Sequence, residues 1–275
     1  MGTSSTDVRV ADCHAHILLP SLFPFASPQA DDPPERDTDS YLEAVTPLRV
    51  RKSVFVTPSR YHADNRATAA AIARVGRSHS RGVAAVNETS RLDDLSAQGM
   101  VAARFNLASP GGAGSIEALR TLADRVADVG WHVEVHARPP FWSEHEIALS
   151  TLSVPLVIDH VGRVPGDRNP GSDPDIAALL RLLDRGNTWV KVSGVCHDSS
   201  SGPPQYSDRA ALARAVIRYA PERAVWGSDW PHVSSLRVGS NPPREIDLLT
   251  APLQGIPEST RKLVLWTNAR KLYGF

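Results

Sequence analysis

The chain has 275 residues, 41% of them hydrophobic, which suits one folded domain over residues 1–275 with a full apolar core. Thirty basic and thirty acidic residues leave no formal net charge, so the overall balance favours neither nucleic acid nor an anionic membrane as a partner. With two cysteines, a polar N-terminus that lacks the apolar core of a signal peptide, and no stretch of transmembrane length, we expect a cytoplasmic protein.

Eight short apolar segments alternate along the chain with segments of helical periodicity, such as 38–50, 65–77, 115–129 and 208–219. Strands that alternate with helices pair in parallel, and eight such units predict a closed (β/α)8 barrel, the TIM barrel of the α/β class. In that fold the active site forms at the carboxyl ends of the strands. The expected strands are 8–16, 51–57, 82–87, 100–106, 131–137, 155–161, 188–194 and 224–229.

The first expected strand ends in two histidines, His14 and His16. Side chains alternate along a strand, so these imidazoles should project to one side and Cys13 to the other, which disfavours a nucleophilic role for the thiol. Two imidazoles with this spacing can converge on a divalent cation or on a polar atom of a substrate. The same short pattern also occurs at strand ends without any function.

The next segment, 18–37, is a long Pro-rich loop that would either shape a substrate pocket or form a surface excursion. After the second expected strand, Arg60, Tyr61 and His62 are candidates for contact with a substrate. Asp64 and Asn65 are instead expected to cap the helix that follows them.

The fourth expected strand directs Arg104 and Asn106 to the same side. An arginine inside a barrel is costly unless it meets an anion, so Arg104 is either a substrate clamp or half of a structural ion pair. The Gly-rich turn at 109–114 is a weak phosphate-binding signal, and we interpret it as a flexible loop.

Strand 5 should direct Glu134 and His136 inward, with His136 at the strand end, and strand 7 should direct Lys191 inward. We expect Glu134 and Lys191, together with Arg104, to form a buried polar network beneath the site.

Strands 6 and 8 each add a polar group at the same rim. His160 should face the interior, with Arg163 just beyond it, and Asp229 should face inward at the end of strand 8. Gly227 leaves room for a close approach between strands, and Pro231 ends the strand. Four strands therefore deliver imidazoles or a carboxylate to one end of the predicted barrel.

Taken together, these strand ends resemble the amidohydrolase superfamily, in particular the branch of TIM-barrel hydrolases that includes 2-pyrone-4,6-dicarboxylate lactonase, sulfomuconolactone hydrolase and sugar lactonases. The resemblance covers nearly the whole chain. The matching residues are Asp12-x-His14-x-His16, Asp64-Asn65-Arg66, Arg104-Phe105-Asn106, His136, Asp159-His160-x-Gly162-Arg163 and Gly227-Ser228-Asp229-Trp230-Pro231-His232.

The resemblance implies a site for one divalent metal ion, with Zn²⁺ as the expected metal and His14, His16, His136 and Asp229 as its ligands. His160 matches the histidine that contacts the attacking water or the substrate carbonyl. The end of strand 4 lacks a lysine that could be carboxylated, which disfavours a binuclear centre. Because the same branch includes lactonases that act without metal, a metal-free mechanism stays open.

The expected reaction is hydrolysis of a small carboxylated lactone or related cyclic ester. Zinc lowers the pKa of its bound water to about 7, while Asp229 would act as the general base and His160 would polarise the carbonyl. Arginines suit carboxylate binding because they form charge-assisted pairs. The expected substrate contacts are Arg60, Tyr61, Arg104, Asn106, Arg138, Arg163, Trp230 and His232.

Two alternatives remain at this point. Superfamily relatives that resemble aminocarboxymuconate-semialdehyde decarboxylase remove CO2 with a similar His/Asp metal site, and a barrel without activity could serve as a binding protein. The Trp230-Pro231-His232 ending favours hydrolysis, and the intact His/Asp set disfavours an inactive barrel. A homo-oligomer is compatible with the sequence.

Overall fold

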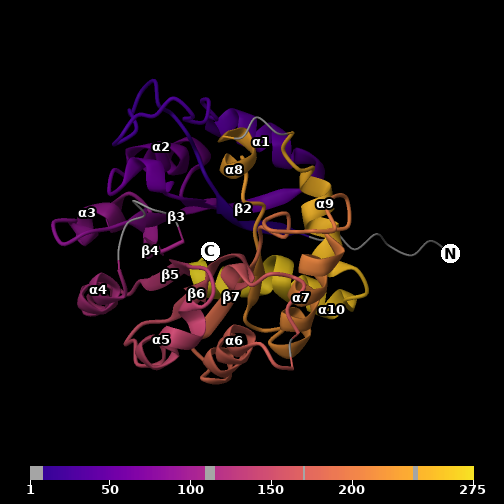
Figure 1. Cartoon of the computed structure of the whole chain (residues 1–275). Helices are drawn as coiled ribbons and strands as arrows, with labels where there is room; N and C mark the ends of the chain where they lie inside the picture. Colours follow the sequence, from indigo (N-terminus) through magenta and orange to yellow (C-terminus); the bar gives the residue numbers. More distant parts are fainter. Residues whose placement is uncertain (1–8, 109–114, 170, 238–240) are drawn as a thin grey trace.

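Eight strands form one sheet in which all neighbours are parallel and the spatial order follows the chain. The structure is a computed structural model that describes residues 9–108, 115–169, 171–237 and 241–275. Figure 1 shows the helices surrounding the strands, which confirms the predicted (β/α)8 barrel. The strands are β1 (Val10–Ala15), β2 (Val50–Val56), β3 (Ser80–Ala85), β4 (Met100–Asn106), β5 (His132–His136), β6 (Leu156–Ile158), β7 (Thr188–Val192) and β8 (Ala224–Trp226).

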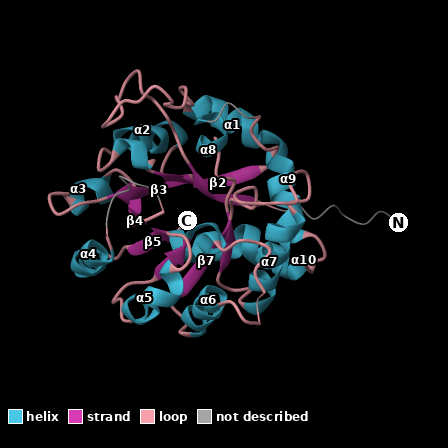
Figure 2. Ribbon diagram, in the orientation of Figure 1, coloured by secondary structure: helices cyan, strands magenta, loops and turns pink. Residues whose placement is uncertain are grey.

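The helices form the outer layer, which Figure 2 shows in cyan around the magenta strands. The α-helices are α1 (Thr38–Val45), α2 (Arg66–Val75), α3 (Leu92–Ala97), α4 (Ile116–Asp128), α5 (Phe141–Ser150), α6 (Pro174–Asp184), α7 (Ser207–Tyr219), α8 (Val233–Arg237), α9 (Glu245–Thr250), α10 (Glu258–Lys262) and α11 (Asn268–Tyr273). Short helical turns are η1 (Thr46–Leu48), η2 (Ser59–Tyr61), η3 (Asp159–Arg163), η4 (Ala251–Leu253) and η5 (Leu263–Thr267). Among the described residues, no helix has the length and apolar character needed to cross a bilayer.

The hydrophobic core lies between the strands and the helices. Its residues recur every three or four positions in a helix and every second position in a strand. Helix α4 is capped by the Ser115 hydroxyl, which accepts a hydrogen bond from the backbone N–H of Ala118, and it buries a stripe at intervals of three and four residues. Strand β5 turns Val133 and Val135 outward to the same cluster, so its polar residues face the barrel interior. The stripe on α4 is Leu119, Leu122, Ala123 and Val126.

The barrel closes where the segment after β8 meets β1. The backbone N–H of Asp229 donates to the carbonyl of His14 (2.8 Å), and that of His16 donates to the carbonyl of Trp230 (2.7 Å). A Cβ atom on Gly227 would lie 2.7 Å from the Cβ of His14 and 2.9 Å from its backbone nitrogen, so only glycine allows this approach. The predicted close approach at Gly227 is therefore confirmed.

Strand β1 departs from simple alternation. Its pairing with β2 shifts register between Asp12 and Ala15, and Cys13 packs in the interior cluster with Ala11 and Tyr273. The prediction that Cys13 points away from the barrel interior was therefore wrong, because the irregularity places Cys13 and His14 on the same side. Burial raises the pKa of the Cys13 thiol well above its usual value, which leaves the thiol uncharged and unsuited to act as a nucleophile.

Other local predictions also need correction. Strand β6 ends at Ile158, because the expected strand residues beyond it form the turn η3, and β8 ends at Trp226, so Asp229 follows the strand. Helix α1 ends at Val45 and continues only as η1, and its cap is Asp37, which accepts from the backbone N–H of Ser40 (2.8 Å).

Asn65 makes no capping bond for α2, contrary to the expectation. Its side chain instead joins β2 to β3, accepting from the hydroxyl of Thr57 (2.7 Å) and from the backbone N–H of Ala85 (2.9 Å). Asp64 does accept from the backbone N–H of Arg66 (3.1 Å), in the first turn of the helix. The Gly-rich turn at 109–114 lies outside the described residues.

The closure of the barrel gives a stability prediction. We expect Gly227→Ala to lower the free energy of unfolding by about 1–3 kcal/mol, because the new methyl group overpacks against the backbone of β1. Chemical denaturation followed by circular dichroism measures this loss. The control is Gly171→Ala, whose Cβ would meet only the Asn169 side chain at 3.4 Å. Equal stability of the two variants would contradict a tight β1–β8 closure.

Candidate active site

Polar side chains from distant parts of the chain meet at the carboxyl ends of the strands. The Nε2 atoms of His14 and His16 lie 3.3 Å apart, and each lies 3.6 Å from Oδ1 of Asp229. The Nε2 atom of His160 lies 3.8 Å from the same oxygen. All four residues are buried, so one small polar cluster stands at the rim where the fold places active sites.

Three of these atoms fit a single divalent metal ion. Ligands at metal–nitrogen distances of about 2.0–2.1 Å in a tetrahedron lie roughly 3.4 Å apart, which is close to the spacing among His14, His16 and Asp229. The Nδ1–H of His16 donates to the carbonyl of Val56 (2.7 Å), which leaves its Nε2 free to act as a ligand. Burial, with the nearby His14 and Arg104, lowers the pKa of His16 to about 3, so the imidazole is neutral.

The fourth expected ligand has another partner. Nη1 of Arg163 donates to Nε2 of His136 (3.3 Å), and the ring of His136 packs against that of His160 with centroids 4.9 Å apart. His136 therefore lies beside the cluster, with its Nε2 engaged by a guanidinium and its buried Nδ1 without a partner among the described residues.

A second group of possible metal ligands, formed by His14, Glu134 and Asp159, already surrounds a cation of the protein. The ammonium group of Lys191 donates to Glu134, and it lies 3.3 Å from Oδ1 of Asp159 and 3.0 Å from Nδ1 of His14. Burial alone would lower the pKa of Lys191, but Asp159 and Glu134 raise it above its usual value. The ammonium thus stands where a second metal would bind, in agreement with the mononuclear interpretation.

These contacts confirm the predicted network of Glu134 and Lys191, and they add Asp159 to it. Arg104 joins through Asp159, since its Nε lies 3.7 Å from Oδ2 of that carboxylate. Arg104 also donates to the carbonyl of Thr57 and to the hydroxyl of Ser59, both at 3.3 Å. Arg104 therefore takes part in an ion pair within the protein, and its role as a substrate clamp stays a prediction.

The turn η3 explains how consecutive residues can serve one site. His160, Val161, Gly162 and Arg163 all have φ between 51° and 64°, a left-handed conformation that is unfavourable for side chains with a Cβ. The indole of Trp142 donates to the carbonyl of Gly162 (2.7 Å), and Arg209 donates to that of His160 (2.9 Å). The turn thereby directs both Asp159 and His160 toward the cluster.

His197 belongs to the site although the sequence analysis did not select it. Its Nε2 donates to Oδ2 of Asp229 (2.6 Å), and its ring lies 5.4 Å from that of His160. Burial alone would raise the pKa of Asp229, but His160 and the hydrogen bond from His197 hold it well below its usual range. The carboxylate is therefore ionised. The sequence shows this histidine shortly after the seventh strand. Histidines in the same position on other strands were selected as site candidates, so the same rule could have identified His197.

Two predicted substrate arginines share one carboxylate. Asp198 accepts from Arg163 (3.0 and 2.6 Å) and from Arg138 (3.2 and 3.1 Å). Arg163 is buried, whereas Arg138 is exposed. The amide nitrogen of Asn106 donates to the hydroxyl of Ser59 (2.5 Å), so Asn106 lines the same rim with its donor engaged.

The other predicted substrate contacts hold neighbouring segments in place. The hydroxyl of Tyr61 accepts from the backbone N–H of Leu19 (2.7 Å), and Arg60 forms an ion pair with Asp32, so both fasten the loop 18–37 over η2. Phe25 of this loop packs against Tyr61 with ring centroids 5.0 Å apart. The loop is therefore fastened to the barrel at Leu19, Phe25 and Asp32.

Trp230 and His232 also make contacts with the scaffold. The ring of Trp230 packs against that of Tyr41 with centroids 5.6 Å apart. His232 donates to Glu245 (2.6 Å), and although burial opposes its charge, the neighbouring Cys196 and Glu245 raise the pKa of His232 to about 10. His232 is thus a charged structural partner of α9.

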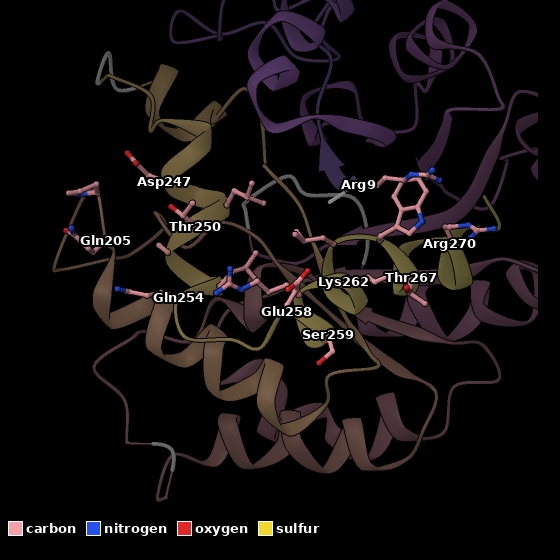
Figure 3. Close-up of a pocket in the computed structure, with 17 residues that line it drawn as sticks. Arg9, Gln205, Asp247, Thr250, Gln254, Glu258, Ser259, Lys262, Thr267 and Arg270 are labelled. Atoms are coloured by element: carbon pink, nitrogen blue, oxygen red, sulfur yellow. The ribbon is translucent and has the colours of Figure 1, made fainter. Parts of the chain in front are cut away.

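A large surface pocket of about 1550 Å³ lies elsewhere, along α9, η4, α10 and η5 (Figure 3). Its lining includes Arg9, just before β1 begins, and Trp266. The guanidinium carbon of Arg9 lies over the Trp266 ring, 5.8 Å from the ring centroid. The amino end of β1 is the opposite end from His14 and His16. This pocket therefore shares no residue with the histidine cluster.

Comparisons with known proteins identify relatives of this chain along nearly its whole length. The chain is 30% identical to 4-sulfomuconolactone hydrolase of Hydrogenophaga intermedia, over 96% of this chain and 88% of the relative. It is 32% identical to D-galactarolactone isomerase of Agrobacterium fabrum, over 95% of this chain and 90% of the relative. Among solved structures, the chain resembles a probable 2-pyrone-4,6-dicarboxylic acid hydrolase from Acinetobacter baumannii, crystallised with citric acid bound. The TM-score is 0.80 at 26% identity, and the match covers 97% of this chain and 99% of the other.

The family model described as Amidohydrolase matches residues 11–275, nearly the entire chain. This match covers β1 with its two histidines, the turn η3 and the segment after β8 that carries Asp229. The resemblance inferred from the strand ends is thereby confirmed, and the chain belongs to the amidohydrolase family of enzymes.

Proposed function

We propose that this protein hydrolyses a small lactone that carries a carboxylate, using a water molecule activated at Asp229. One observation carries the proposal: the ionised carboxylate of Asp229 is buried beside the neutral imidazoles of His16 and His160, and it interacts with the charge of a buried arginine, Arg163. A buried anion of this kind is suited to accept a proton from water, and a guanidinium is suited to hold an acidic substrate. Relatives named as hydrolases of sulfomuconolactone and of pyrone dicarboxylate support the same substrate class.

In this mechanism Asp229 moves the proton. Oδ1 faces the imidazoles and would take a proton from the attacking water, while the bond from His197 holds Oδ2 and fixes the plane of the carboxylate. The carboxyl group would then return the proton to the ring oxygen that leaves when the lactone opens. Asp229 ends the cycle ionised, as it began.

His160 would stabilise the oxyanion that forms on the substrate carbonyl. Its Nδ1 lies 2.9 Å from the hydroxyl of Ser193. With Ser193 as the donor, the ring hydrogen resides on Nε2, which faces Asp229 and the reaction site. Burial lowers the pKa of His160 well below its usual value, so the neutral ring can donate this hydrogen bond without a change of charge.

His14, His16 and Asp229 would hold one divalent ion, and we propose Zn²⁺ because the set is two imidazoles and a carboxylate with tetrahedral spacing. When bound, such an ion supplies a Lewis acid and lowers the pKa of its water ligand to about 7.

The primary test combines elemental analysis of the purified protein with a panel of carboxylated lactones. We expect about one equivalent of zinc and ring opening detected as release of acid. Release of CO2 from an unsaturated or aromatic acid would instead support the decarboxylase alternative, and isomerisation without acid release would support an activity like that of the galactarolactone isomerase. Absence of turnover across all three assays would contradict the proposed enzymatic function.

Asp229→Asn tests the general base. We expect kcat for lactone opening to fall by a factor of about 100 or more, since the amide cannot take a proton from water. Citrate binding measured by calorimetry should persist, because Asp229 makes no ion pair with the substrate arginines Arg138 and Arg163. Asp124→Asn, on an exposed face of α4, is the matched control. A variant that retains most of its kcat would exclude Asp229 as the base.

Arg163→Met tests the sign of the substrate charge. We expect KM for an acidic lactone to rise by roughly 10-fold or more, because a charge-assisted pair with the substrate is lost. KM for a neutral lactone of the same ring size should change much less. Arg181→Met removes an exposed arginine that pairs with Glu146 and serves as the control. An equal rise for both substrates would argue against carboxylate recognition by Arg163.

A further inference from the structure

A single carboxylate of the protein occupies the place where two substrate-facing arginines converge. Asp198 follows β7, Arg138 follows β5, and Arg163 ends the turn η3 after β6. The Oδ2 atom of Asp198 accepts from Nε and Nη2 of Arg163 (3.0 and 2.6 Å). Both of its oxygens lie within 3.2 Å of Nη1 of Arg138. Three successive strand ends therefore build one anion subsite that already contains an anion.

The location of this pair relates it to the catalytic cluster. Arg163 donates through Nη1 to Nε2 of His136, whose ring packs against that of His160. The side chain of Arg163 is only 6% exposed, whereas that of Asp198 is 31% exposed. Asp198 thus lies on the solvent side of a buried guanidinium, from which direction a dissolved acid would approach.

Asp198 is held there by the two arginines alone. Within the described ranges, its side chain has no hydrogen-bond partner other than Arg138 and Arg163. Its backbone has φ 55°, in a loop whose neighbouring serines bond to Asp208 instead. Rotation of the Asp198 side chain would break only these ion pairs, and a substrate carboxylate would replace them with equivalent bonds.

The charges explain why such a group is useful. A buried guanidinium without a counter-ion is strongly unfavourable, so a site built only from arginines would destabilise the empty protein. Asp198 supplies the counter-ion in the free state, and Arg163 with Arg138 keeps the carboxyl ionised at neutral pH. An acidic substrate then exchanges one carboxylate for another, while a neutral molecule cannot displace it.

We propose that Asp198 is an internal competitor that occupies the carboxylate subsite of Arg138 and Arg163 in the free protein and is displaced by the acid group of the substrate. The proposal rests on the proposed function for the identity of the substrate class. It makes Asp198 a specificity-determining residue, because removal of its charge should increase the affinity for anions.

The test is calorimetric titration of citrate, a small polycarboxylate, into the full-length protein. Asp198→Asn should bind citrate about 10-fold or more tightly than the wild-type chain, because the competing charge is gone. Glu146→Gln is the matched control: it removes the carboxylate partner of the exposed Arg181, which is not among the expected substrate contacts, and should leave citrate affinity unchanged. The double variant Asp198→Asn with Arg163→Met should lose the gain, because the arginine that binds the anion is absent.

Each contrary result overturns the proposal. If Asp198→Asn folds and binds citrate equally or more weakly, Asp198 orients the arginines and does not compete with the ligand. If this variant and the smaller Asp198→Ser both lose cooperative thermal unfolding, the carboxylate is a structural group. Because binding is measured without turnover, tight citrate binding together with inactivity toward every lactone would sustain this inference and refute the proposed function separately.

Discussion

The centre of the barrel depends on one buried ammonium group. Lys191 is fully buried, and its neighbours Glu134, Asp159 and His14 come from β5, η3 and β1. In an interior of low dielectric, two carboxylates cannot remain ionised side by side without a cation between them. Lys191 provides this cation, and Oδ1 of Asp159 lies 3.4 Å from Nδ1 of His14. His14, a member of the buried polar cluster, thus lies within a charge network that spans three parts of the barrel.

Much of this arrangement follows from alternation along straight strands. Strands β4, β5 and β7 keep a strict two-residue period, so the inward directions of Arg104, Glu134 and Lys191 could be read from the sequence alone. The location of the site at one end of the barrel could also be predicted, because parallel strands place their last residues at the same end. Alternation along a strand does not predict which group an inward-facing side chain will contact. In the structure, Arg104 forms an ion pair with Asp159.

The failures occur where the backbone leaves the regular strand. Cys13 was misplaced because β1 shifts its register against β2, and a shift of one residue reverses the side that a side chain faces. Strand β6 was predicted too long, because the left-handed turn η3 has no signal in the sequence beyond Gly162. His197 and Asp198 were missed because they lie in an irregular loop, where no periodicity indicates direction.

The far end of the barrel is connected to the catalytic end through side chains. The hydroxyl of Tyr273, in α11, donates to Oε1 of Glu134 (2.9 Å), whose other oxygen accepts from Lys191, and Lys191 lies 3.0 Å from His14. Figure 1 shows the C-terminus projecting onto the middle of the strand ring. The last helix is therefore part of the active site's electrostatic support. A fusion partner or purification tag attached after Phe275 would therefore sit close to this support.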